Sequence, residues 1–240
     1  MTMHMSHRGA KLPYRPLAGV VPCPGGWLVA GAKLQGITLS PEEPQVFRTL
    51  LDVIDYKPAY QIISLAAPIG LLDEPEPGGR HCDRDARRLV GWPRNGAIVS
   101  APARSVLRDL AQGMEVQVSA VSRRIIGRIV EVEDNVQPYW QRTVFEVHPE
   151  LSFFQLNEDR PLRFSKHRRV GVEERTALLK ARLPGVERIL DTRVAGAKPT
   201  HHVDAAVCLW TARRIAARAV NRLPEDPEWD SAGLRMEIVR

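Results

Sequence analysis

The sequence predicts an α/β fold with a mixed five-stranded sheet flanked by helices. Strands with short connections are expected near the amino terminus, because apolar segments alternate there with Pro and Gly. A near-continuous apolar run at residues 60–65 is typical of a central strand that is covered on both faces. Apolar residues at helical spacing follow these regions, so helices are expected to cover the sheet.

Local signals place the individual elements along the chain. Strands are expected at residues 17–21, 27–31, 34–39, 60–65 and 144–147, and a last strand at 234–239 closes the chain. Ser40 precedes Pro41 and Glu43, so it is expected to cap the next helix, and a turn at 31–33 separates two strands. Helices are expected at residues 41–56, 82–90, 105–112, 118–133, 172–182, 186–191 and 200–220.

The segment TVFEVHPELSFF, residues 143–154, is expected to be a strand with a polar end. Alternation along a strand places Phe145 and Val147 on one face and Glu146 and His148 on the other. Pro149 then begins a helix, because proline is tolerated where no N–H partner is needed. Polar strand ends are where α/β folds build their sites. The simpler interpretation is a buried strand with one neutralised or exposed glutamate.

Length and composition limit the class of protein. With 240 residues and 44% hydrophobic content, the chain can bury a full core, and we expect one domain at 17–240 after a flexible arm at 1–16. The formal charge of +6 permits contact with a polyanion without requiring it. No apolar run reaches the ~18 residues that a membrane span needs.

The cysteines indicate a reducing setting. Cys23, Cys82 and Cys208 are far apart and have no C-x-x-C spacing, so neither a disulfide framework nor a zinc site is predicted. We therefore expect a cytoplasmic protein without a membrane partner. Cys82 lies in a mixed-charge helix and is expected to be a small buried packing residue.

Several separate motifs occur along the chain in a fixed order. They are GVVPCPGGW at 19–27, APIGL at 67–71, GGRHCDRDARRLVG at 78–91, FEVHPELSF at 145–153, DAAVCLWTARR at 204–214 and GLRMEIV at 233–239. Together they resemble a bacterial family of unknown function that is predicted to consist of ribonuclease H-like nucleases. The resemblance covers residues 18–240 and implies a ribonuclease H-like fold.

The resemblance also implies a metal site made of four carboxylates. In the family, the first strand usually reads GVDGCxGGW and the fourth ends in IDIPIG, and two Mg²⁺ or Mn²⁺ ions ~3.5–4 Å apart would be held by such a cluster. Glu146 and Asp204 match two of the carboxylates. Val21 and Ala66 stand at the positions of the other two, and apolar side chains cannot coordinate a hard cation. The site is therefore expected to be eroded.

Other side chains are candidates for replacing the missing ligands. Asp73 and Glu74 follow the strand at 60–65, and a loop that folds back could offer one ligand, with His148 as another. His201 and His202 precede Asp204 and could form a transition-metal site, although paired histidines at a helix start are more often exposed caps.

Basic residues accompany two of the family motifs. They are Arg80, Arg84, Arg87 and Arg88 in the 78–91 motif and Lys166, Arg168 and Arg169 after the Glu146 strand. These are the side chains expected to contact phosphates if the protein binds nucleic acid. The alternative for the first group is ordinary surface ion pairing with Asp83 and Asp85.

Three functions follow, and they belong to different classes. The first is a catalytically impaired family member that binds nucleic acid or a protein partner at the eroded site and holds no cofactor. The second is an active nuclease that uses Glu146, Asp204, His148 and a replacement ligand such as Asp73 with Mg²⁺ or Mn²⁺. The third is a structural subunit in which the apolar tips at Val21, Ala66 and Ala67 pack against another chain.

Overall fold

The main sheet has six strands in mixed directions. The computed structural model describes residues 13–240, apart from the side chain of Val121. The strands are β1 (Arg15–Cys23), β2 (Gly26–Gln35), β3 (Thr38–Pro41), β4 (Gln45–Phe47), β5 (Ile62–Leu65) and β6 (Val144–Glu146). Their order is β3-β2-β1-β5-β6, and β4 pairs with β2 beside β3. β1 to β4 pair in antiparallel fashion, whereas β5 and β6 run parallel to β1.

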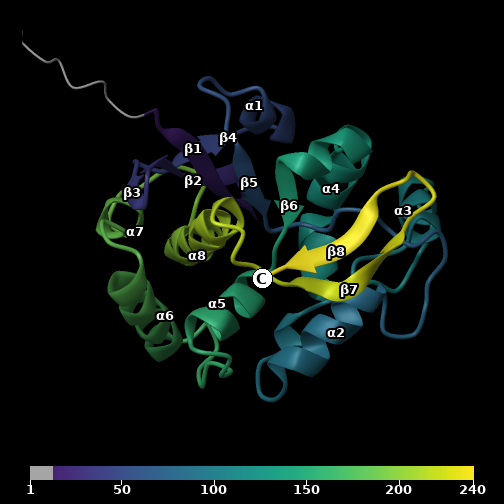
Figure 1. Ribbon diagram of the computed structural model, residues 1–240. Coiled ribbons are helices and arrows are strands. Elements are labelled where there is room, and N and C mark those ends of the chain that lie inside the picture. Colours follow the sequence, from purple (N-terminus) through teal and green to yellow (C-terminus); the bar gives the residue numbers. More distant parts are fainter. Residues whose placement is uncertain (1–12) are drawn as a thin grey trace, which may run out of the picture.

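Helices cover both faces of this sheet (Figure 1). They are α1 (Leu50–Ile54), α2 (His81–Val90), α3 (Arg104–Ala111), α4 (Ala120–Asn135), α5 (Pro149–Leu156), α6 (Arg169–Arg182), α7 (Glu187–Leu190) and α8 (Pro199–Ala216). α8 packs on one face, where Gly19 lets its backbone come close: a Cβ there would lie 2.2 Å from Leu209 N. α1 and α4 contribute to the buried cluster on the opposite face.

A second sheet of two strands, β7 (Arg222–Trp229) and β8 (Arg235–Val239), lies outside the main sheet. It packs against α2, and Met236 and Ile238 share a buried cluster with Cys82, Leu151 and Phe154. The expected last strand therefore exists, but it pairs with β7. β7 was not predicted, since RLPEDPEW contains two prolines and reads as a loop.

Two further predictions about the first sixty residues were wrong. β2 runs through the expected turn at 31–33, and the chain turns at Gly36, which has a φ of 59°. The expected helix at 41–56 is reduced to α1, which Thr49 caps in place of Ser40 through a capping box with Asp52. Most of the expected arm at 1–16 lies outside the described residues, and β1 begins within its last part.

The remaining helices agree with the sequence within a few residues, except that α8 ends at Ala216 and not near 220. Within residues 13–240, no helix has both the length and the apolar character needed to cross a membrane.

Candidate functional site at the ends of β5 and β6

The polar end of β6 presents Glu146 toward the sheet face that is opposite α8. Glu146 is in register with Leu65 of β5, which is in register with Val20 of β1. Val20 and Leu65 both belong to the buried cluster formed with α1 and α4. Val147 and Phe145 lie in the α8 cluster. The predicted alternation along this strand is therefore confirmed for Phe145, Glu146 and Val147.

Glu146 is bound by a buried arginine, Arg80, at the start of α2. The Arg80 guanidinium donates to both carboxylate oxygens of Glu146 at 2.6 and 2.8 Å, and to both of Asp83 at 2.8 and 3.2 Å. It also donates to the carbonyls of Ile69 and Gly70, while the Ile69 N–H donates to Glu146 at 2.6 Å. All three guanidinium nitrogens are thus engaged inside the protein, where Arg80 is 1% exposed.

The charges in this cluster perturb one another. Burial raises the pKa of Glu146, and Arg80 opposes that shift. Burial alone would lower the pKa of Arg80, but Asp83 and Glu146 raise it well above its ordinary value. Arg80 therefore stays charged, and one cation is shared between two carboxylates.

Asp204 has a different internal cation. Lys166, in the connection between α5 and α6, places its Nζ 2.6 Å from Asp204 Oδ2 near the start of α8. Asp204 raises the pKa of Lys166, so the pair is ionic. Among the described residues, no hydrogen bond or ion pair joins Asp204 to Glu146. The two matching family carboxylates do not form a shared pair.

His148 follows Glu146 by two residues, and the charges of both ionic groups act on it. It caps α5, where its Nδ1 accepts the Glu150 N–H at 3.2 Å, so the ring proton is on Nε2. Burial and then Lys166 lower its pKa from 6.5 to about 4. His148 is therefore a neutral capping residue near pH 7, and its predicted catalytic role stays a prediction.

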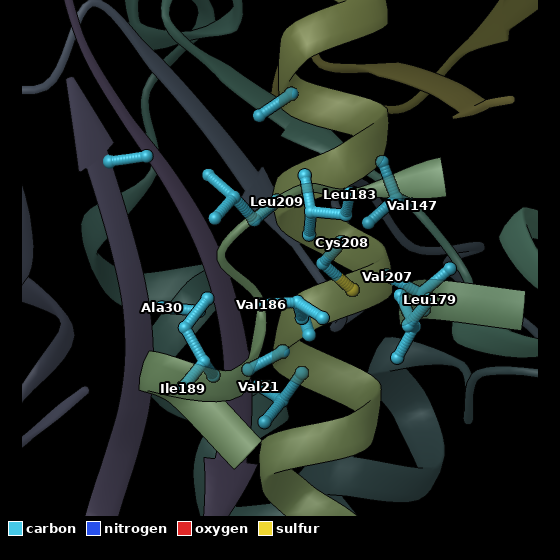
Figure 2. Close-up of a cluster of buried hydrophobic side chains, with 14 of the residues drawn as sticks. Val21, Ala30, Val147, Leu179, Leu183, Val186, Ile189, Val207, Cys208 and Leu209 are labelled. Atoms are coloured by element: carbon cyan, nitrogen blue, oxygen red, sulfur yellow. The ribbon is translucent and has the colours of Figure 1, made fainter. Parts of the chain in front are cut away.

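The positions of the missing carboxylates are filled by apolar packing. Val21 is buried in the α8 cluster with Val186 and Ile189, and Figure 2 shows it beside that helix. Ala66 packs against the same cluster and donates its N–H to the Val20 carbonyl. Within the described residues, no group of three or more His, Cys, Asp or Glu side chains could hold a metal ion. The two-metal site implied by the resemblance does not fit these residues.

The candidate replacement ligands lie in other networks. Asp73 accepts from Arg104 at 3.0 Å and from Ser231 at 2.8 Å, and Glu74 is 3.9 Å from a guanidinium nitrogen of Arg108. No described hydrogen bond or ion pair connects either carboxylate to Glu146 or Asp204.

The paired histidines also have local roles. His201 Nδ1 accepts the Lys198 N–H at 3.0 Å, as a capping residue does. His202 is buried, with Nδ1 2.9 Å from the Ile189 carbonyl, so the expectation that it is an exposed cap was wrong.

The family is established by comparison with known proteins. The family described as "Protein of unknown function (DUF429)" matches residues 19–229. The chain belongs to the DUF429 family. No curated protein and no solved structure was found to match it.

In this DUF429 chain, most arginines of the 78–91 motif hold loops together. Arg84 donates to the Gly79 carbonyl and Arg87 to the carbonyls of Gly78 and Ile98, whereas exposed Arg88 pairs with Asp85 at 3.1 Å. Surface pairing with Asp85 is thus confirmed for Arg88. Arg80 does not fit the predicted phosphate contact, because all its nitrogens are used in the interior. Cys82 is buried, as predicted.

Sequence reasoning missed a second buried ion pair. Both carboxylate oxygens of Glu150 accept from Arg175 at 2.9 Å, and the Arg175 guanidinium lies 5.3 Å from the centre of the Phe153 ring. The acidic residue after Pro149 could have suggested a buried cation, but nothing in the sequence indicates that α6 supplies it.

Proposed function

We propose that this DUF429 protein is a ribonuclease H-like protein that binds nucleic acid without cleaving it. The observation that carries the proposal is the internal neutralisation of the two matching carboxylates: Arg80 binds Glu146, and Lys166 binds Asp204. The formal charge of +6 supports a polyanionic partner.

The ribonuclease H-like part of the proposal is supported by the order of elements. Antiparallel strands β1 to β3 are followed by β5 and β6, which run parallel to β1, and the long helix α8 covers one face. This is the order of elements that the resemblance implied.

The absence of cleavage is supported by electrostatics. A divalent ion enters a protein site when several anionic oxygens compensate for its lost hydration. Glu146 is already paired with Arg80, and Val21 and Ala66, which pack on the α8 side, offer no oxygen in their side chains. An entering ion would have to displace a guanidinium that is held by both Glu146 and Asp83. The active-nuclease alternative would require that rearrangement.

The test is calorimetric titration with Mn²⁺ together with a nuclease assay on single- and double-stranded DNA and RNA. Wild type is expected to show neither specific Mn²⁺ binding nor Mn²⁺-dependent cleavage. The variant Val21→Asp with Ala66→Asp restores two carboxylates, and its control, Ile37→Asp with Gln112→Asp, adds the same charge at exposed positions. The restored variant is expected to gain Mn²⁺ affinity and the control to gain none.

The wild-type result decides the proposal even if the restored variant does not fold. Cleavage by wild type that requires Mn²⁺ and is abolished by Glu146→Gln would overturn the proposal in favour of the active nuclease. No nucleic-acid binding at low salt, together with a stable complex with a protein, would favour the structural subunit instead.

A further inference from the structure

The connection between α5 and α6 concentrates positive charge. After Glu158 and Asp159, the segment from 160 to the first residue of α6 at 169 reads RPLRFSKHRR and includes no acidic residue. Its cations are Arg160, Arg163, Lys166, Arg168 and Arg169. The connection lies at the edge of the molecule, between the two helices that it joins (Figure 1). Apart from Lys166, these cations are exposed.

The backbone of this connection is held from within. The two carboxylate oxygens of Glu174 accept the N–H groups of Arg163 and Phe164 at 3.1 and 3.2 Å, and Arg175 donates to the Phe164 carbonyl at 2.9 Å. Gly171 allows close contact, since a Cβ there would lie 2.0 Å from the Ser165 carbonyl oxygen. A preorganised segment loses little conformational entropy on binding.

The side chains it presents suit a nucleic acid strand. The Arg163 guanidinium lies 5.9 Å from the centre of the Phe164 ring, and Phe164 is 38% exposed although it is a large apolar residue. The Arg168 side chain makes no hydrogen bond or ion pair with any described residue. Arg169 pairs with Glu173, but it is 93% exposed and the pair is weak. This differs from Arg80, whose donors are used in the interior, and from half-buried Arg84 and Arg87, which donate to backbone carbonyls.

The positive surface extends to the start of α8. Lys166 is anchored there by Asp204. Lys198 caps the same helix, and its backbone N–H donates to Nδ1 of His201, three residues before Asp204, at 3.0 Å. Exposed Lys198 therefore adds to the same positive region.

We infer that residues 163–169, with Lys198, form a docking surface for single-stranded nucleic acid, with Arg163 and Arg168 on phosphates and Phe164 stacked on a base. This inference deepens the proposed function and rests on it. A single strand fits better than a duplex, because an exposed ring next to cations needs an unpaired base to stack on. An acidic protein surface would use the cations but would leave Phe164 without a stacking partner.

The first experiment measures fluorescence anisotropy of a labelled 20-nucleotide DNA strand of mixed sequence in EDTA, titrated with the full chain at 50 to 200 mM salt. With about three phosphates neutralised on a single strand, Kd is expected to rise ~20-fold over this range. Arg163→Gln with Arg168→Gln is expected to weaken binding ~10-fold at 50 mM salt, and Phe164→Leu ~5-fold or more. The matched control, Arg88→Gln with Arg108→Gln, removes two exposed cations elsewhere and is expected to change Kd less than twofold.

Three results would overturn the inference: no binding at 50 mM salt, equal losses in the test and control variants, or no effect of Phe164→Leu together with equal affinity for a duplex or for polyglutamate. The assay also separates this inference from the proposed function. EDTA removes metal-dependent cleavage, and a denaturing gel after addition of Mn²⁺ shows whether the strand stays intact. Cleavage after addition of Mn²⁺ would contradict the proposed function, because the protein would then cut nucleic acid, but it would not contradict the docking surface.

Discussion

Glu146 and Asp204 are the two carboxylates that the sequence resemblance singled out, and the protein neutralises them in different ways. Glu146 shares Arg80 with Asp83, and the side chains of that cluster are 1–5% exposed. Asp204 is paired with Lys166, whose side chain is 36% exposed. The first pairing involves all three nitrogens of a guanidinium, whereas the second is a single contact of an ammonium group.

The difference indicates which of the two carboxylates can respond to a ligand. A guanidinium presents a rigid fork that matches two carboxylates at once, and it stays charged at any accessible pH. Lysine carries a compact charge on a flexible stem. The Glu146 cluster is thus a fixed internal support for β6 and α2. The Asp204 pair lies at the edge of the exposed basic connection and can rearrange at lower cost.

The largest expected effect comes from breaking the Glu146 cluster. Arg80→Met leaves Glu146 and Asp83 buried without their cation, so the free energy of unfolding should fall by about 3–5 kcal/mol. Urea denaturation followed by circular dichroism measures this. Arg88→Met, which removes an 80% exposed arginine from the same helix, should cost less than about 0.5 kcal/mol.

A loss of under 1 kcal/mol for Arg80→Met would contradict the assignment of Arg80 as the internal cation. If Arg80→Met does not fold, Arg80→Lys provides the measurement. Lysine keeps the positive charge but lacks the planar fork of the guanidinium. The loss of unfolding free energy for Arg80→Lys should therefore be smaller than that expected for Arg80→Met.

Local patterns in the sequence were sufficient to predict part of the candidate site. Period-two alternation placed Phe145 and Val147 on one face and Glu146 on the other, and Pro149 marked the start of α5. Such patterns act over a few residues, and these were confirmed. β7 was missed because its prolines suppress strand propensity, whereas its extended conformation is stabilised by pairing with β8 and by packing against α2.

The ion partners could not be predicted for a different physical reason. Arg80 with Asp83 and Asp85 with Arg88 are both opposite charges at i,i+3 spacing in one helix region, yet the first pair is buried and the second is exposed. Their difference arises from Glu146, which is 66 residues away from Arg80 in sequence and reaches it only in the folded sheet. Burial of this kind is a tertiary property that the helical pattern does not encode.

The next expected effect concerns His148, on which the charges of both ionic groups act. Its pKa is lowered to about 4 in the folded protein, so between pH 6.5 and 4 the unfolded chain binds a proton that the folded protein does not. Stability should therefore fall as the pH decreases through this window. At 1.36 kcal/mol per pKa unit, and after allowance for the partial exposure of the His148 side chain, the free energy of unfolding should fall by about 2 kcal/mol across this window.

Urea midpoints at pH 4, 5, 6 and 7 for wild type and His148→Asn isolate this contribution. Asparagine can still accept the Glu150 N–H at the helix start, but it does not titrate. The difference in stability between the two proteins should shrink or reverse toward pH 4 and stay constant above pH 7. Parallel pH profiles would show that His148 does not titrate in this range.

The smallest expected effect is at the Asp204 pair. Lys166→Met should cost about 1 kcal/mol, because the Lys166 side chain is 36% exposed and its truncation lets water reach the Asp204 carboxylate, which is 9% exposed in the folded protein. A double-mutant cycle with Asp204→Asn should give a coupling of ~0.5–1 kcal/mol, smaller than the coupling of Arg80→Met with Glu146→Gln measured in the same way. Equal couplings would mean that the two carboxylates are equally fixed, and Lys166 would then be a structural cation as Arg80 is. A small coupling, together with a reduced single-strand affinity of Lys166→Met, would instead connect the Asp204 pair to the basic surface beside it.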